Sequence, residues 1–202
     1  MEGDTKERIL RTALALFADR GYAGTSVSDI AGALGLSKAA LYRHYAGKQA
    51  ILESIVARME ARDREKAQES GVPQDAPDGD AQAYRRTPPA RLCAFTKAMF
   101  RYWTQDPFAS AFRRLLTLEQ YHDNRMAQLL RQYLSQGPLE YVQALLSGVE
   151  EDAHALALAF YGPVYLMYSV YDGAADRQGV TDELDAYVDG FAARWEGTEH
   201  EG

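Results

Sequence analysis

Apolar side chains recur every three or four residues near the N-terminus, which is the spacing of one face of an α-helix. Ile9, Ala13, Leu16 and Phe17 follow this spacing, and Gly21 comes four residues after Phe17. Glycine readily adopts the left-handed conformation that ends many helices. The pattern therefore predicts a first helix over residues 5–20.

The next twenty residues predict two short helices joined by a tight turn. Ser26 is a good N-cap, and Asp29 three residues later completes a short capping box. Gly35 ends this second helix, and Ser37 caps a third helix over residues 38–45. The apolar residues expected to lock the two helices together are Ile30, Ala31, Leu34, Leu36 and Leu41.

The remainder of the chain also has helical spacing, with one interruption. A fourth helix begins near Lys48, and glycines, prolines and aspartates then mark a linker. The later helices are expected over residues 91–104, 108–118, 122–136, 138–146, 152–171 and from a Thr181 cap to about 195. Residues 122–146 are compatible with two helices or with one kinked helix. Pro163 is expected to bend the long helix that contains it.

No segment has a convincing alternating strand pattern, so the predicted fold class is all-α. We expect an N-terminal three-helix domain with a helix-turn-helix, followed by a C-terminal helical domain. The expected division is a helix-turn-helix domain at residues 1–47, a connecting helix at 48–66, a flexible linker at 67–89 and the helical domain at 90–202.

The formal charge of −7 is unevenly distributed along the chain. Residues 1–66 carry 11 lysines and arginines against 9 aspartates and glutamates, whereas residues 67–202 carry 11 against 20. The first segment is therefore net +2 and the second net −9. Exposed charges are screened beyond about 10 Å at moderate salt. The local basic charge of residues 1–66 therefore decides whether this segment can bind phosphate.

Composition also restricts the compartment. The chain contains one cysteine, Cys93, so it forms no internal disulfide, which fits a reducing environment. The N-terminal residues MEGDTKER lack the apolar core of a secretion signal, and no stretch is expected to reach the length that spans a bilayer. We expect a cytoplasmic protein with no membrane partner.

The helix-turn-helix has the residues needed to enter the major groove of DNA. Lys38 can reach a guanine edge or a phosphate, and Ala39 and Ala40 leave room for close approach to thymine methyl groups. Tyr42, His44 and Lys48 are candidates for contacts with the DNA backbone. The alternative is a small helical subdomain whose polar residues are only solvated.

The segment over roughly residues 6–60 resembles the TetR family of transcriptional regulators. The residues that carry the resemblance are Ile9, Leu10, Ala13 through Phe17, Gly21, Tyr22, Thr25 to Val27, Asp29 to Ala31, Leu34 to Lys38, Leu41 to Tyr45, Lys48 and Leu52. The resemblance implies double-stranded DNA as partner, a helical ligand-binding domain and a dimer formed by the last two helices. The DNA contacts it implies are Ser26, Val27, Ser28, Ser37, Lys38, Ala39, Ala40, Tyr42, Arg43, His44 and Lys48. Alanines at 39 and 40 leave few long side chains to specify bases.

Two apolar stripes near the C-terminus are candidates for the dimer interface. The helix over residues 152–171 and the last helix both show apolar residues over a wide arc, so both must be buried. Packed against their symmetry mates, they would form a four-helix interface. The residues expected there are Phe160, Pro163, Val164, Met167, Leu184, Val188, Phe191 and Trp195. The alternative is that both stripes belong to the internal core.

The C-terminal part also contains candidates for a pocket that binds a small apolar or aromatic inducer of unknown identity. These residues are Met99, Tyr102, Trp103, Phe112, Leu116, Tyr121, His122, Tyr161 and Tyr165. Residues of these types are more often ordinary core than ligand contacts, so core packing is the alternative for each of them.

Other classes of protein have weaker support. Four histidines and one cysteine supply no recognisable catalytic set, and there is no glycine-rich phosphate loop, so we expect no enzyme activity and no cofactor. The spacing of His122 with Asp123, and of residues 150–152 with His154, matches no tight metal site. Cys93 is expected to be buried and inert. Within the regulator class, family analogy favours a repressor over an activator or a ligand-independent regulator. A helical interaction protein without a DNA role is a further alternative, but it would leave the charge distribution unexplained.

Overall fold

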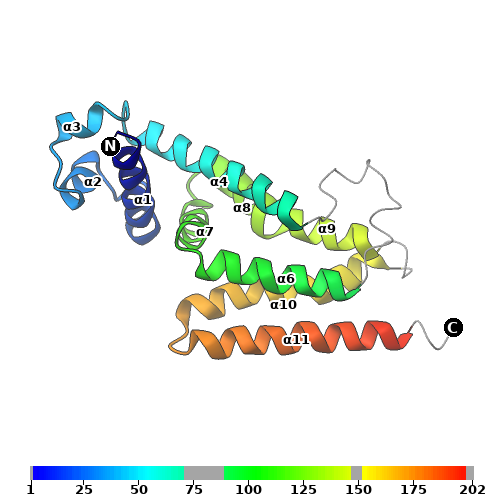
Figure 1. The fold of residues 1–202 in the computed structure, drawn as a ribbon. Helices are drawn as coiled ribbons and strands as arrows, with labels where there is room; N and C mark the ends of the chain where they lie inside the picture. The colour runs from blue at the N-terminus through cyan, green and yellow to red at the C-terminus, as the bar shows by residue number, and fades with distance from the viewer. Residues whose placement is uncertain (1, 71–88, 147–151, 199–202) are drawn as a thin grey trace. The chain divides into compact units, whose positions relative to one another are not determined.

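The computed structural model describes residues 2–70, 89–146 and 152–198, and the side chains of residues 4–65, 90–146 and 152–193. These residues form helices and no strands, so the all-α prediction is confirmed (Figure 1). The helices are α1 (Glu2–Arg20), α2 (Val27–Ala33), α3 (Lys38–Tyr42), α4 (Lys48–Ser70), α6 (Pro89–Gln105), α7 (Pro107–Glu119), α8 (Asn124–Leu134), α9 (Gln136–Leu146), α10 (Ala153–Gly173) and α11 (Arg177–Thr198).

The helices group into two compact units. The first contains residues 1–69 and 107–130, and the second contains residues 70–106 and 131–202. This packing differs from the division expected at residue 90, because α7 and the start of α8 join the N-terminal helices. The sequence pattern shows which face of α7 is apolar but not which helix covers that face.

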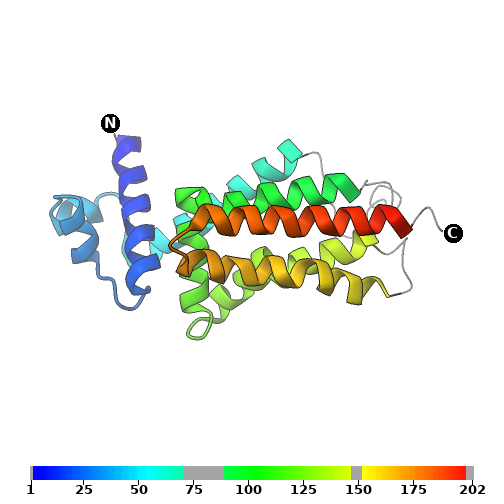
Figure 2. The ribbon, with the colours of Figure 1, turned by 90° about the horizontal axis from the view of Figure 1, so that it is seen from below.

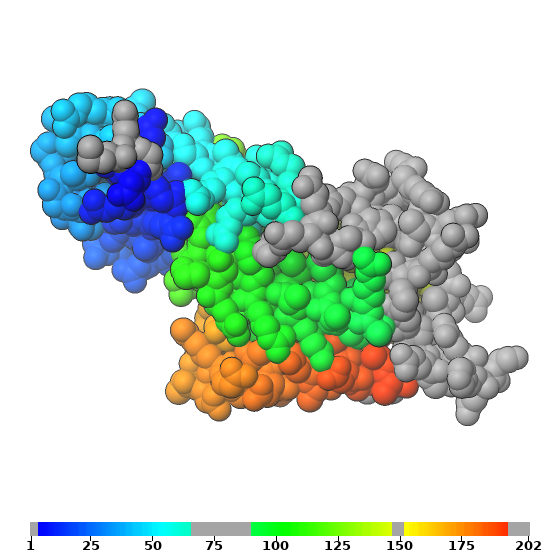
Figure 3. Space-filling model, viewed as in Figure 1, coloured from blue at the N-terminus to red at the C-terminus, as the bar shows by residue number. Residues whose placement is uncertain are grey.

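The first unit is built around α1, which packs against α2 and α7. Of the predicted apolar face, Ile9, Ala13 and Phe17 are completely buried, whereas Leu16 is partly exposed. Burying such side chains contributes roughly 1.5–3 kcal/mol each for the large ones. In the space-filling view, α2 and α3 occupy part of the surface of this unit (light blue in Figure 3).

The second unit consists of α6, α9, α10 and α11 together with the end of α8. Helices α10 and α11 run side by side in both ribbon views (Figures 1 and 2), and α11 also packs against α6. Lys97 on α6 binds Asp189 on α11 at 2.6 Å, and Arg101 binds Asp185. Cys93 is buried in this unit, as predicted, with its Sγ 3.7 Å from the Val188 carbonyl oxygen.

Several helix boundaries differ from those predicted. The third helix ends at Tyr42 instead of residue 45, because the His44 and Tyr45 amides both bond to the Leu41 carbonyl in a turn. Helix α4 continues to Ser70, into the predicted linker, and residues 71–88 lie outside the described part. Residues 122–146 form two helices rather than one.

The prediction that Thr181 caps the last helix is wrong. Helix α11 begins earlier, at Arg177, and the Asp176 carboxylate accepts a hydrogen bond from the Gly179 amide at 2.9 Å. The Thr181 hydroxyl instead donates to the Arg177 carbonyl at 3.0 Å, inside the helix. Residues 172–180 were expected to form a loop, but α10 includes residues 172–173 and α11 includes residues 177–180.

Helix α10 differs from the expectation that no stretch of the chain could span a bilayer. It is long and apolar enough to cross a membrane by length and composition, although the sequence was expected to contain no such stretch. Phe160, Val164 and Tyr168 are nevertheless buried within the second unit, and the Tyr187 hydroxyl donates to the Ala159 carbonyl at 2.5 Å. These contacts are typical of a helix in a helical core, which can be as apolar as a membrane span.

Candidate nucleic-acid interface

A reciprocal capping box fixes the start of α2. The Ser26 hydroxyl oxygen accepts from the Asp29 amide at 3.2 Å, and the Asp29 carboxylate accepts from the Ser26 amide at 2.7 Å. The Ser26 side chain also donates to this carboxylate at 2.6 Å. These bonds satisfy amides that the first turn of a helix leaves without intrahelical partners, and they confirm the predicted box.

The turn between α2 and α3 has the hydrogen bonds of a Schellman motif. The Leu36 amide donates to the Ala31 carbonyl at 2.9 Å, and the Gly35 amide donates to the Gly32 carbonyl at 3.1 Å. Gly35 has φ +65°, in the left-handed region that favours glycine. The turn therefore ends α2 at a defined position and fixes where α3 begins.

Helix α3 starts at Ser37, whose hydroxyl accepts from the Ala40 amide at 3.1 Å. The predicted cap is thus confirmed. Leu41 is completely buried and attaches this short helix to the rest of the unit. Of the expected core, Ile30, Ala31 and Leu41 are buried, whereas Leu34 and Leu36 are partly exposed.

The opposite face of the two helices is open to solvent. Tyr42 is 51% exposed, and the other exposed members of the predicted contact set are Ser26, Ser28, Ser37, Lys38, Ala39 and Arg43. Val27, Ala40, His44 and Lys48 are partly exposed. This face combines hydroxyl groups, two cationic side chains and a tyrosine, which are the groups that bind phosphate and base edges.

Two of the predicted DNA contacts, Lys48 and His44, have side-chain atoms that face the protein rather than solvent. The Lys48 ammonium donates to the carbonyls of Tyr22 and Thr25, at 2.6 and 2.8 Å, and lies 4.2 Å from the centre of the Tyr22 ring. Lys48 therefore joins α4 to the segment that precedes α2, and one of its three protons remains for a phosphate. The Nδ1 atom of His44 is buried without a hydrogen-bond partner, so only its Nε2 side can address DNA.

Asp29 gives the cap a pH dependence. The hydrogen bond from the Ser26 side chain, followed by that from the Ser26 amide, lowers the pKa of the Asp29 carboxyl. Because the folded-state pKa is lowered, ionised Asp29 contributes stability above its ordinary pKa, and this contribution is lost as the pH falls through the lowered value.

We therefore expect Asp29→Asn to destabilise the protein near neutral pH and to have no effect in strong acid. Ser26→Ala is expected to lower the free energy of unfolding by about 1 kcal/mol. Urea unfolding across the acid range tests both variants, with Asp4→Asn at an exposed position of α1 as the control. A destabilisation by Asp29→Asn that stays constant down to the lowest pH would contradict this explanation.

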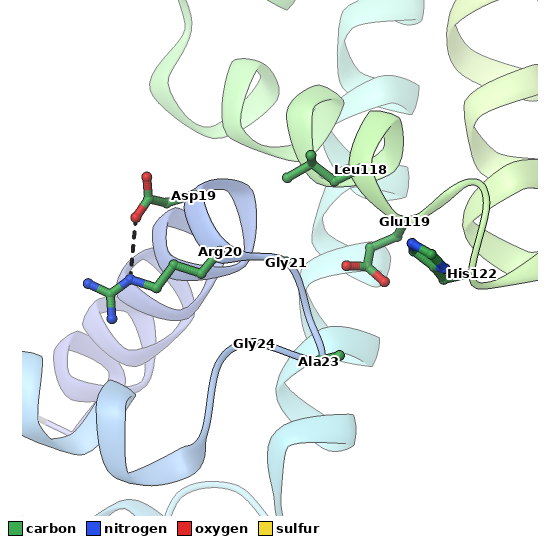
Figure 4. A pocket seen from close by; sticks show the side chains of 8 residues that line it. All are labelled: Asp19, Arg20, Gly21, Ala23, Gly24, Leu118, Glu119 and His122. Carbon is green, nitrogen blue, oxygen red and sulfur yellow. Dashed lines mark hydrogen bonds and ion pairs between the residues drawn. The ribbon is translucent and has the colours of Figure 1, made fainter.

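A pocket of about 390 Å³ lies in the first unit between the end of α1 and the end of α7. Its lining residues are Asp19, Arg20, Gly21, Ala23, Gly24, Leu118, Glu119 and His122. Figure 4 shows the Glu119 carboxylate and the His122 ring on the side of the pocket that faces the segment after α1. The sequence predicted His122 as a pocket residue but did not single out Glu119, because nothing local links it to residues about one hundred positions earlier.

The structure does not gather the predicted inducer-binding residues within one unit. Phe112, Leu116, Tyr121 and His122 belong to the first unit, whereas Met99, Tyr102, Trp103, Tyr161 and Tyr165 belong to the second. Tyr121 and Tyr165 are 81% and 42% exposed, so in the single chain they line no enclosed cavity. Tyr102, Trp103 and Tyr161 are buried, with the first two rings 5.5 Å apart and the Tyr161 hydroxyl 2.9 Å from the Leu134 carbonyl oxygen. Tyr133, 5.8 Å from Trp103, extends this aromatic group and was missed.

Most of the predicted dimer residues are core residues of the second unit. Phe160, Val164, Leu184, Val188 and Phe191 are buried within the single chain, and the Phe160 and Phe191 rings are 4.7 Å apart. This is the alternative that the sequence left open. Pro163 and Met167 are partly exposed, and the side chain of Trp195 lies outside the described residues. Side chains buried in one chain cannot also form its surface for a second copy, so that expectation needs correction.

Helix α10 has another apolar face, which is exposed. Its large members are Leu158, Tyr165, Leu166 and Val170, each between 41% and 61% exposed. Apart from Tyr165, these residues were not predicted from the sequence, although Tyr165 and Leu166 follow Leu158 by seven and eight residues and Val170 follows Leu166 by four, which is the spacing of one helix face.

Together, the two capped helices, the fixed turn and the cationic exposed face form a helix-turn-helix, an arrangement that proteins use to enter the major groove of DNA. Residues 9–55 match the model of the bacterial regulatory proteins of the tetR family. The match covers the N-terminal segment that carries the sequence resemblance, so the helix-turn-helix of this chain is similar to that of the tetR family.

Curated relatives match over a stretch of 51 residues of this chain. It is 45% identical over 51 residues to the HTH-type transcriptional regulator YerO of Bacillus subtilis, and 41% identical over 51 residues to IcaR of Staphylococcus aureus, a negative regulator of a biofilm operon. The match covers 25% of this chain, 18% of YerO and 27% of IcaR. The match therefore spans less than a third of this chain and less than a third of either relative.

Solved structures extend the likeness of the fold to nearly the whole chain. A TetR-family regulator from Agrobacterium tumefaciens has a TM-score of 0.64 at 15% identity, covering 96% of this chain and 98% of its own. A transcriptional regulator from Saccharomonospora viridis in complex with choline has a TM-score of 0.63 at 19% identity, covering 94% and 95%. At these identities the comparison shows a common fold.

Proposed function

We propose that this protein is a ligand-responsive repressor that binds a palindromic operator as a homodimer in the cytoplasm. The observation that carries the proposal is the exposed face of α2 and α3, with Ser28, Lys38, Tyr42 and Arg43 at the surface and Leu41 beneath it. Phosphate contacts from this face would fix the protein on the duplex, and contacts from α3 would read bases. Repression agrees with the role named for IcaR.

The dimer is proposed from the size of the reading element. Helix α3 has only five residues, so one copy can touch few base pairs. Two copies about 34–36 Å apart could occupy successive major-groove faces of an inverted repeat. The exposed apolar face of α10 supports such a pairing, because contiguous apolar surface on a soluble protein commonly marks an interface.

We expect Leu166→Glu to convert a dimer to a monomer, because it would place a charge in the centre of an apolar interface. Leu166 is 61% exposed, so the isolated chain should keep its thermal stability. Sedimentation velocity at micromolar protein measures the change, with Glu183→Gln at an exposed position of α11 as a control that should remain dimeric. A wild-type monomer, or a Leu166→Glu dimer, would contradict this interface.

The inducer is proposed to be a small apolar or aromatic compound bound among the aromatic side chains of the second unit. Tyr102, Trp103 and Tyr161 supply rings, and rings of this kind also favour cationic ligands such as the choline bound by the Saccharomonospora viridis regulator. An inducer must bind the DNA-competent and DNA-incompetent states with different affinity. DNA fragments from the genome around its own gene, tested for binding with and without candidate compounds, examine the whole proposal. No retained fragment would refute DNA binding, and retention unaffected by every compound would refute induction.

A further inference from the structure

Tyr22 is held on both sides by residues of the first unit. Its amide donates to Oε1 of Glu119, the last residue of α7, at 2.8 Å. Its carbonyl accepts from the Lys48 ammonium at 2.6 Å, and its hydroxyl donates to Oε1 of Gln49 at 2.9 Å. The Tyr22 ring packs edge-on against Phe17, with 5.2 Å between the ring centres. The segment between α1 and α2 is thus clamped between α7 and α4.

Glu119 is suited to such a clamp because it is itself fixed. Its side chain belongs to a residue that is only 8% exposed, and its carbonyl accepts from the amides of His122 and Asp123, each at 2.9 Å. A buried carboxylate that accepts a backbone N–H forms a charge-assisted bond, which is stronger than a neutral one. The end of α7 therefore has one defined position for this acceptor.

Gly21, the residue before Tyr22, shows how closely the Glu119 carboxylate approaches this segment. Gly21 has φ +76°, and a Cβ atom placed there would lie 2.9 Å from Glu119 Oε1. Gly35 also has a positive φ, but a Cβ there would meet nothing within 4 Å. The backbone conformation therefore favours glycine at 21, and a Cβ there would shift the Glu119 carboxylate from its present position.

The clamped segment leads directly into the DNA-reading helices. Thr25 is 1% exposed, its hydroxyl donates to the Gly21 carbonyl at 3.0 Å, and its own carbonyl accepts from Lys48. Ser26, the next residue, is the cap of α2. A displacement at Tyr22 is thus passed on through a short, internally bonded segment to the start of α2.

We propose that Glu119 is a positioning residue for DNA binding, which holds the Tyr22 amide and thereby the start of α2 in the arrangement that fits the duplex. The proposal rests on the DNA-binding role proposed above. Without the carboxylate, the start of α2 would adopt several arrangements, of which one fits the duplex. The apparent affinity for DNA would then fall in proportion to the fraction of molecules in that arrangement.

Simple electrostatics predicts the opposite change. Removal of the acidic charge of Glu119, which lies beside the N-terminal helices, should strengthen binding to DNA slightly. Glu119→Ala and Glu119→Gln both remove this charge, but the glutamine keeps an oxygen that can accept from the Tyr22 amide. The two variants therefore separate positioning from charge.

The test measures DNA affinity and amide exchange on the full chain at a temperature well below its unfolding transition. For Glu119→Ala we expect about tenfold weaker binding, which is the effect of losing a hydrogen bond to a charged group. Glu119→Gln should bind within about twofold of wild type, and only the alanine variant should lose protection of the Tyr22 amide. Glu60→Ala, at an exposed position of α4, is the matched control for charge.

Glu119→Ala with the affinity of the Glu60→Ala control, or with unchanged Tyr22 protection, would overturn the proposal. Equal losses in the alanine and glutamine variants would also overturn it, because an oxygen able to accept from the Tyr22 amide would then make no difference to binding. If Glu119→Ala does not fold, Glu119→Asp, whose carboxylate is retracted by one methylene, replaces it in the same comparison. A wild-type protein that binds no duplex would refute the proposed function. The exchange protection of the Tyr22 amide in wild type and Glu119→Ala would still show whether Glu119 holds this amide.

Discussion

Reversing the charge of Lys38 and Arg43 together, with glutamate at both positions, is expected to weaken DNA binding at least about 100-fold at physiological salt. Both residues are exposed on the face formed by α2 and α3. Each reversal replaces attraction to a phosphate or base edge by repulsion, and 100-fold corresponds to about 2.7 kcal/mol. Thermal unfolding should change little, because exposed charges contribute little to stability.

Fluorescence anisotropy with a labelled duplex at several salt concentrations measures this effect. The slope of log affinity against log salt should become shallower by about 0.9 for each phosphate that the variant no longer neutralises. Arg125→Glu with Arg131→Glu, two exposed positions of α8, makes the same change in net charge and is the control. If both pairs weaken binding equally, total charge rather than this face determines affinity, and the assignment fails.

Leu41→Ala is expected to have the largest effect on stability among single substitutions in α3. Leu41 is 0% exposed and is the buried residue of that helix. Replacing a fully buried leucine by alanine removes apolar contacts and leaves a cavity, at a cost of about 3 kcal/mol. Because α3 has only five residues, too few for an isolated helix, the substitution should also release it from its position and weaken DNA binding.

Urea unfolding measures the stability change, and the duplex titration measures the binding change. Leu118→Ala is the control because Leu118, on α7, is 45% exposed, and its truncation should cost less than about 1 kcal/mol. Equal destabilisation by the two variants would show that Leu41 is not the anchor of α3.

The features that the sequence predicted well are governed by neighbouring residues. Ser26 and Asp29 are three positions apart, and Gly35 follows the last turn of α2, so local hydrogen-bonding rules suffice to place the caps and the turn. Thr181 shows the limit of the same rules, because Asp176 five residues earlier offers a competing cap and takes the role.

The features that were missed depend on contacts between distant segments. Glu119 meets Tyr22 across 97 residues, and no pattern in either segment indicates the other. On α10, the periodicity correctly required burial of Phe160 and Val164, but it could not say whether a helix of the same chain or of a second copy covers them. Packing within the second unit decides that question.

The central claim, that residues 26–45 recognise DNA, is tested most directly by selecting duplexes from a random library with the wild-type protein and sequencing those retained. We expect enrichment of an inverted repeat with half-sites about one helical turn apart, and loss of this enrichment when Lys38 and Arg43 are both replaced by glutamate. No enriched sequence, or the same enrichment with the charge-reversed protein, would contradict it.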